Sequence, residues 1–194
     1  MDHQFFLASR SPRRRQLLEQ VGLRFSVIAG DVTEARAAGQ APADYAVALA
    51  RAKAAAGQRA APAALPVLGA DTDVVLDGVI LGKPAGADEA VEMLQRLSDR
   101  DHEVYTGVAV QLGTRVATAL SVTRVHFGLV SREAARAYWA TGEPADKAGA
   151  YGIQGHGARF VRRIEGSYSG VVGLPLYETC ELLARFDVRP SPAA

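Results

Sequence analysis

The chain has 194 residues, of which 48% are hydrophobic and 22% charged, and its formal net charge is +1 at pH 7. This length suffices for one well-buried domain or for two closely packed lobes. Because the net charge is close to zero, no overall basic field draws the protein to nucleic acid or to a membrane surface. Any affinity for anions must therefore come from local clusters of basic side chains.

Cysteine and histidine usage excludes two further classes. The single cysteine, Cys180, cannot form an intramolecular disulfide, and the four histidines are scattered, so a zinc site with thiolate ligands is not expected. The first ten residues hold only a short apolar run, which resembles neither a signal peptide nor a membrane-spanning helix of about 20 residues. We therefore expect a cytoplasmic protein with no membrane partner.

The periodicity of apolar residues predicts strands and helices that alternate along the chain. Strands are predicted over residues 4–8, 25–29, 67–76, 79–81, 103–112, 116–127, 158–164 and 170–173. Helices are predicted over residues 12–21, 43–57, 87–98, 131–140 and 175–185. The fold class is therefore α/β.

Turn dipeptides indicate how these elements are joined. Asp77-Gly78, Gly113-Thr114 and Glu165-Gly166 predict hairpins, so the sheet is expected to be mixed, with parallel and antiparallel strands and flanking helices. The Ala-, Gly- and Pro-rich residues 55–66 are typical of a surface connection, and residues 190–194 of a frayed tail. No domain boundary is evident, and we expect one domain over residues 1–194.

The first predicted helix carries positive charge where a helix disfavours it. Ser11 can cap this helix, Pro12 suits its first position, and Gly22 suits a left-handed end. Three arginines at residues 13–15 nevertheless occupy the first turn, where the helix dipole disfavours each cation by about 0.3–1 kcal/mol. Free N–H groups at a helix start bind anions, and arginine makes bidentate contacts with phosphate oxygens. The cluster therefore indicates a phosphate site.

Two carboxylates interrupt a strand that is otherwise suited to burial. Asp71 and Asp73 point to one face of this predicted strand, and Thr72 points to the other. Burying a charge is costly unless the charge is paired or bound to a metal. The two acids could flank a cation, or they could mark a polar strand edge that faces solvent. These residues alone do not decide between the two readings.

Two lysines and a glycine-rich segment are further candidates. Lys53 lies on a predicted helix, where a solvated lysine is the default, and Pro84 favours an extended backbone that aims the amine of Lys83 away from the strand end. The glycines within residues 146–157 permit close backbone approach to a ligand. No Rossmann, P-loop or G-x-S-x-G motif is present. A basic helix start, lysines, carboxylates and a glycine-rich segment together suit a polyphosphate.

Seven segments in chain order resemble the Maf family of nucleotide pyrophosphatases and span almost the whole chain. They are LASRSPRRRQLLEQVGLRF, LARAKA, LGADTDVV, LGKP, YTGVAV, DKAGAYGIQG and GVVGLPLYET. The resemblance implies a mixed α/β fold of two lobes around a substrate cleft, commonly dimeric. It also implies a cytoplasmic enzyme, dependent on Mg²⁺ or Mn²⁺, that hydrolyses a nucleoside triphosphate to the monophosphate and pyrophosphate.

The same resemblance assigns roles to individual residues. Asp71 resembles the family's proton acceptor and Glu34 its metal-associated carboxylate, so both are expected at the metal. The family usually carries a further acid where this chain has Thr33, although Asp31 is close by. The residues expected to contact phosphate are Ser9, Arg14, Lys53 and Lys83.

Substrate choice is expected to depend on Arg13, Thr72 and Gln154. Family members that resemble 7-methyl-GTP pyrophosphatases tend to carry Trp, Gln and Glu at these three positions. A tryptophan can stack on a cationic methylated purine, whereas glutamine offers both a donor and an acceptor, as the imide edge of a pyrimidine requires. We therefore expect dTTP and UTP as substrates, with 7-methyl-GTP as the alternative.

A non-enzymatic alternative comes from a different class of function. The family has an association with septum formation, and the arginines of residues 13–15 could contact a nucleic-acid backbone in a regulatory protein. One short basic cluster, no aromatic stacking platform and a net charge near zero make a poor nucleic-acid footprint. We therefore expect no stable nucleic-acid partner, and the resemblance implies a homodimer that binds a nucleoside triphosphate.

Overall fold

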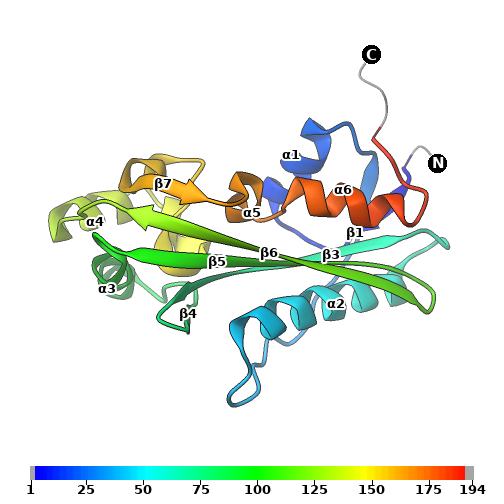
Figure 1. Ribbon diagram of the computed structural model, residues 1–194, viewed down its shortest axis with the longest axis horizontal. Coiled ribbons are helices and arrows are strands. Elements are labelled where there is room, and N and C mark those ends of the chain that lie inside the picture. Colours follow the sequence, from blue (N-terminus) through cyan, green and yellow to red (C-terminus); the bar gives the residue numbers. More distant parts are fainter. Residues whose placement is uncertain (1–2, 191–194) are drawn as a thin grey trace.

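A single mixed sheet forms the centre of the protein, whose computed structural model describes residues 3–190 (Figure 1). The strand order is β2-β1-β3-β5-β6-β7, and β4 pairs with β3 outside this path. β1 pairs in parallel with β2 and β3, whereas the other pairs are antiparallel. The strands are β1 Phe5–Leu7, β2 Phe25–Val27, β3 Val67–Leu76, β4 Val79–Leu81, β5 Asp101–Leu112, β6 Arg115–Phe127 and β7 Val161–Glu165. The predicted α/β class with a mixed sheet is confirmed.

Helices cover both faces of this sheet. Figure 1 shows α2 on one face, α1, α5 and α6 on the other, and α3 and α4 at the end of the sheet near β7. The helices are α1 Pro12–Gln20, α2 Pro42–Ala60, α3 Ala87–Leu97, α4 Arg132–Trp139, α5 Tyr168–Val172 and α6 Leu176–Ala184. Short 3-10 turns are η1 Glu143–Asp146, η2 Ala148–Ala150 and η3 His156–Phe160. No helix within residues 3–190 has both the length and the hydrophobicity needed to cross a membrane.

Helix α2 packs closely against the sheet because two glycines of the sheet face it. A Cβ atom at Gly69 of β3 would lie under 3.0 Å from the backbone of Ala50, and one at Gly107 of β5 under 3.0 Å from the backbone of Ala46. Only a glycine fits at such a distance, and the small side chains on this side of α2 allow the same approach from the helix. The alanine-rich sequence of α2 therefore positions its side chains against β3.

A row of hydroxyl groups crosses the opposite face of the sheet. Thr72, Thr106 and Ser121 are paired neighbours on β3, β5 and β6. Thr106 is fully buried and donates a hydrogen bond of 2.8 Å to the carbonyl of Gly170 in α5. One hydrophobic cluster, which includes Val74, lies on one side of this row, and a second, which includes Ala70, on the other. The two clusters share one sheet, and the hydroxyl row marks the boundary between them.

Two local predictions are wrong for one reason. Residues 170–173 do not form a strand, and Glu165-Gly166 does not form a hairpin, because the chain enters helix α5. Ser167 caps this helix, and its hydroxyl accepts a hydrogen bond of 3.0 Å from the N–H of Gly170. The valine pair that resembled a strand lies inside this single turn of helix.

The remaining connections follow the sequence more closely. The hairpins at Asp77-Gly78 and Gly113-Thr114 are present, and both glycines adopt positive φ angles, as such turns require. The surface connection predicted from residue 55 begins only after Ala60, because α2 continues through its alanines. Residues 191–194, most of the expected frayed tail, lie outside the described residues.

Candidate functional site

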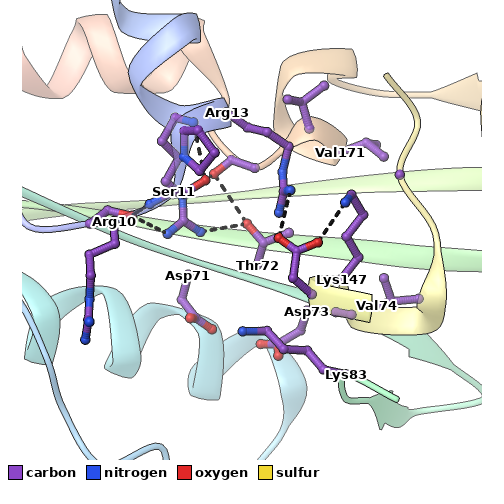
Figure 2. Close-up of a pocket in the computed structure, with 18 of the residues that line it drawn as sticks. Arg10, Ser11, Arg13, Asp71, Thr72, Asp73, Val74, Lys83, Lys147 and Val171 are labelled. Carbon is purple, nitrogen blue, oxygen red and sulfur yellow. Dashed lines mark hydrogen bonds and ion pairs between the residues drawn. The ribbon is translucent and has the colours of Figure 1, made fainter. Parts of the chain in front are cut away.

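A cavity of about 810 Å³ opens where one edge of β3 has no partner strand (Figure 2). On this edge, β1 pairs with β3 only at Val67 and Leu68, and β4 only from Val74 onward. Residues 69–73 are therefore left without a strand neighbour on that side within the described chain. Because the edge is free, side chains from both faces of β3 reach the cavity. It is lined by every residue predicted for the site: Ser9, Arg13, Arg14, Glu34, Lys53, Asp71, Thr72, Lys83 and Gln154.

Carboxylates and one lysine form the first wall of the cavity. Asp71 and Asp73 are 7% and 8% exposed and face α2 from β3. The Nζ atom of Lys53 lies 2.6 Å from Oδ1 of Asp71 and 2.8 Å from Oε1 of Glu34. The default expectation of a solvated Lys53 is therefore wrong. The reading of Asp71 and Asp73 as a polar strand edge that faces solvent is also wrong, because both side chains are buried.

Charge coupling in this wall favours a protonated lysine. Burial alone would lower the pKa of Lys53, but the charges and hydrogen bonds of Asp71 and Glu34 outweigh it and raise that pKa. The hydrogen bond from Lys53 lowers the pKa of Glu34, against the opposing effect of its partial burial. Burial and the adjacent Asp71 carboxylate raise the pKa of Asp73 to about 7. Lys53 is therefore a fixed cation between two carboxylates.

The donor set suits a hard divalent cation without enclosing one. Oδ2 of Asp73 is buried and has no hydrogen-bond partner, so one carboxylate oxygen is left for a ligand. In the part of the chain that is described, no three acidic, histidine or cysteine side chains are gathered into a complete metal site. Mg²⁺ is commonly held by one or two carboxylates together with substrate phosphates and water, so two neighbouring aspartates fit such an ion.

Arg14 forms the second wall of the cavity. Its contacts there explain why one arginine occupies the first turn of α1, where the helix dipole disfavours a cation. Its guanidinium donates from Nε to the carbonyl of Gly173 at 2.8 Å, from Nη1 to Ser9 Oγ at 3.2 Å, and from Nη2 to Thr72 Oγ1 at 3.2 Å. Burial lowers the pKa of Arg14, and the negative charge of Asp71 opposes that shift. The buried cation thus joins the segment after β1, strand β3 and the segment after α5 at one point of the cavity wall.

Two further cations lie at the mouth of the cavity. Arg13 forms an ion pair of 3.4 Å with Asp146, whose other oxygen lies 2.8 Å from Nζ of Lys147. Lys83 is exposed, and Figure 2 shows its amine pointing toward the carboxylates of Asp71 and Asp73. Asp146 and Lys147 were not predicted as site residues, although both lie in a segment that resembled the family.

The glycine loop, residues 152–157, forms the remaining wall. Gly152 and Gly155 line the cavity, and the glycines of this loop also admit other parts of the protein at close range. A Cβ atom at Gly155 would lie under 3.0 Å from the Glu143 carboxylate, and one at Gly157 under 3.0 Å from the hydroxyl of Tyr138. Gln154, which lies between Gly152 and Gly155, is exposed and lines the cavity. Neither Glu143 nor Tyr138 is predicted from the sequence as a site residue, because a lone acid after a helix and a buried tyrosine have no distinctive local pattern.

Comparison with known proteins identifies relatives over almost the whole chain. A family model described as Maf-like protein matches residues 4–186. The dTTP/UTP pyrophosphatase of Methylococcus capsulatus is 54% identical over 182 residues, which cover 94% of this chain and 90% of that protein. The dTTP/UTP pyrophosphatase of Vibrio cholerae is 51% identical over 180 residues, covering 93% and 96% of the two chains. Among solved structures, the Staphylococcus aureus Ham1 protein is 14% identical with a TM-score of 0.47, covering 63% of this chain and 71% of that chain.

Proposed function

This chain belongs to the Maf family, and we propose that it hydrolyses dTTP and UTP to the nucleoside monophosphate and pyrophosphate. One observation carries the proposal. The cavity at the free edge of β3 combines buried carboxylates with lysine and arginine side chains drawn from α1, α2 and the segment after β4. Its volume of about 810 Å³ lies in the range of small-molecule sites and suits one nucleotide.

The basic side chains hold the triphosphate. A guanidinium has five N–H groups, and three of those on Arg14 bind Gly173, Ser9 and Thr72. Two N–H groups of Arg14 therefore have no partner among the described residues, and they can bind phosphate oxygens from a fixed position. Arg13 and Lys83 add cations at the mouth, where they neutralise the charge of the incoming triphosphate. Such pre-positioned charge lowers the barrier because it needs no reorganisation during the reaction.

Asp71 serves as the proton acceptor for the attacking water. A bond forms between the water oxygen and the α-phosphorus while the bond from that phosphorus to the bridging oxygen breaks. Pyrophosphate leaves with the electron pair of the broken bond, and the proton of the water passes to the carboxylate of Asp71. Lys53, 2.6 Å from Oδ1, keeps this carboxylate oriented. General-base assistance of this kind typically contributes about 10²–10⁴-fold.

A divalent cation, Mg²⁺ or Mn²⁺, completes the proposed site. The residues that would hold it are Asp71 and Glu34, as the family resemblance implies, together with Asp73, whose Oδ2 has no partner within the described chain. The all-oxygen donor set supports this choice of ion. When bound, such a cation neutralises phosphate charge and lowers the pKa of coordinated water.

Gln154 recognises the base. Within residues 3–190 its side-chain amide has no hydrogen-bond partner, and it lines the cavity. A primary amide offers a donor and an acceptor side by side, which matches the imide edge shared by thymine and uracil. This complementarity supports pyrimidine nucleotides over 7-methyl-GTP.

A hydrolysis screen tests the proposed function. Purified protein with Mg²⁺ or Mn²⁺ should release pyrophosphate from dTTP and UTP much faster than from dATP or 7-methyl-GTP. Faster release from 7-methyl-GTP would instead support the alternative pyrophosphatase. Salt-dependent binding to duplex DNA, with no pyrophosphate released from any triphosphate, would support the regulatory alternative.

The quaternary state and location complete the proposal. A homodimer is proposed from the family resemblance. Light scattering at several protein concentrations would test for the dimer. A cytoplasmic location remains a prediction from composition.

A further inference from the structure

The carboxylate of Glu143 lies at the centre of the glycine loop. Its Oε1 accepts a hydrogen bond of 2.6 Å from the hydroxyl of Tyr138 and one of 3.2 Å from the N–H of Gly157. Its Oε2 accepts a hydrogen bond of 2.7 Å from the N–H of His156. Both oxygens are therefore occupied by the protein, and every partner is a donor.

Tyr138 extends the same network to the other end of the loop. Its hydroxyl donates to Glu143 and accepts a hydrogen bond of 3.0 Å from the N–H of Gly152. The Tyr138 side chain is fully buried in the core, so the hydroxyl has a fixed position. The pair thus binds backbone N–H groups on both sides of Gln154.

The glycines allow this binding at close range. Side chains at residues 155 and 157 would each place a Cβ atom under 3.0 Å from Glu143 or Tyr138. At position 152 a Cβ atom would lie under 3.0 Å from the side chain of Lys147, whose amine donates at 2.6 Å to the carbonyl of Glu143. The loop is therefore wrapped around the η1 turn and held in place.

We propose that Glu143 is a positioning residue that sets the location of Gln154 and thereby the selectivity of the enzyme for pyrimidine nucleotides. The inference rests on the proposed function, because only a nucleotide substrate gives Gln154 a base to recognise. Glu143 acts through the backbone of the loop, since its own oxygens are taken by Tyr138, His156 and Gly157. Gln154 lies between the bound ends and is free to meet the base.

A carboxylate suits this position better than its amide isostere. All three partners of Glu143 are donors, and a carboxylate is an acceptor at both oxygens. Glutamine would turn an NH₂ group toward at least one of the backbone N–H groups of His156 and Gly157, whichever way the amide is oriented. That end of the loop would lose its hydrogen bond while the shape of the side chain stayed the same.

Three kinetic measurements test the proposal on Glu143→Gln, Gln154→Ala and the double variant. In Glu143→Gln, the KM for dTTP should rise about tenfold, as expected for a lost hydrogen bond to a charged group, and kcat should change less than about twofold. The inhibition constant of inorganic triphosphate, which has no base, should stay at its wild-type value. The double variant should resemble Gln154→Ala alone, because both changes act on one contact.

Hydrogen exchange tests the loop without relying on catalysis. The peptide that spans residues 152–157 should exchange faster in Glu143→Gln and, to a smaller extent, in Tyr138→Phe, which serves if the first variant does not fold. The matched control is Glu133→Gln, an exposed residue on α4, which should change neither exchange nor kinetics. Unchanged exchange, weaker binding of inorganic triphosphate, or effects of Glu143→Gln and Gln154→Ala that simply add would overturn the positioning role. Wild-type protein that hydrolyses no triphosphate would instead overturn the proposed function.

Discussion

Nζ of Lys53 lies 2.6 Å from Oδ1 of Asp71, although one residue belongs to helix α2 and the other to strand β3. This contact depends on how closely α2 approaches the sheet, and that distance is set by Gly69 and Gly107. Side-chain chemistry at the site thus depends on backbone packing at Ala50 and Ala46, about one and two turns of α2 away from Lys53.

Gly107→Ala tests this dependence. The added Cβ atom would lie under 3.0 Å from the backbone of Ala46, so α2 must shift away from the sheet. Overpacking of this kind typically costs about 1–3 kcal/mol of unfolding free energy, and pyrophosphate release should fall as Lys53 moves. Urea unfolding measures the first effect. Gly82→Ala is the control, because a Cβ atom there meets nothing within 4 Å. Equal stabilities of the two variants would contradict this account of the packing.

Asp71→Asn tests the proton acceptor. The amide keeps the shape of the side chain but cannot take the proton, so kcat for dTTP should fall by about 10²–10⁴-fold. Steady-state kinetics measure the loss, and circular dichroism checks that the fold is retained. Asp77→Asn serves as the matched control, since Asp77 lies outside the cavity in an exposed ion pair with Arg100. Near-normal turnover by Asp71→Asn would rule out the assignment.

His102 should make the protein less stable in mild acid. It is 3% exposed, and burial lowers its pKa from 6.5 to about 4. Between these values the unfolded chain binds a proton that the folded chain excludes, so the unfolding free energy is unaffected above pH 6.5 and falls by about 3 kcal/mol as the pH drops to about 4.

Urea unfolding across this pH range would measure the effect of His102. The ring of His102 accepts or donates at 2.8 Å to Tyr151, so His102→Phe should lower stability by an amount that shrinks toward low pH. His156→Gln, at an exposed histidine, should follow the wild-type profile. Parallel profiles for wild type and His102→Phe would show that His102 is not the group responsible.

Removal of divalent cations should abolish hydrolysis while the fold persists. The residues proposed to hold the cation, Asp71, Asp73 and Glu34, line the cavity and are not members of the hydrophobic clusters, so we expect the fold to persist without an ion. Exhaustive chelation should stop pyrophosphate release from dTTP, and added Mg²⁺ or Mn²⁺ should restore it, with little change in the urea midpoint without nucleotide. Full turnover after chelation would remove the cation from the proposal.

Local patterns predicted most elements, because each depends on neighbouring residues. Ser11 and Pro12 mark the start of α1, and the predicted strand at residues 67–76 coincides with β3. The error at residues 170–173 shows the limit of such patterns. Ser167 begins a short helix there, and this helix contacts Thr106 of a distant strand, which a local pattern cannot show.

Arg14 and Asp71 could be singled out in advance, since charged groups at a helix start and in an apolar strand break local rules, whereas Glu34 and Gln154 were named only through the family resemblance. The partners of these residues could not be named in advance. Lys53 meets Asp71 only because glycines on two strands admit α2, and Glu143 meets the glycine loop only because the chain turns back after α4.

The sequence by itself determined most of the helices and strands and the chemical character of the site, because propensity and charge are properties of short segments. Only the tertiary structure decided which edge of β3 stays open, which cation neutralises which carboxylate, and that the loop glycines receive Glu143 and Tyr138. The physical reason is that burial and hydrogen bonding depend on distances between segments far apart in the chain, and packing alone sets those distances.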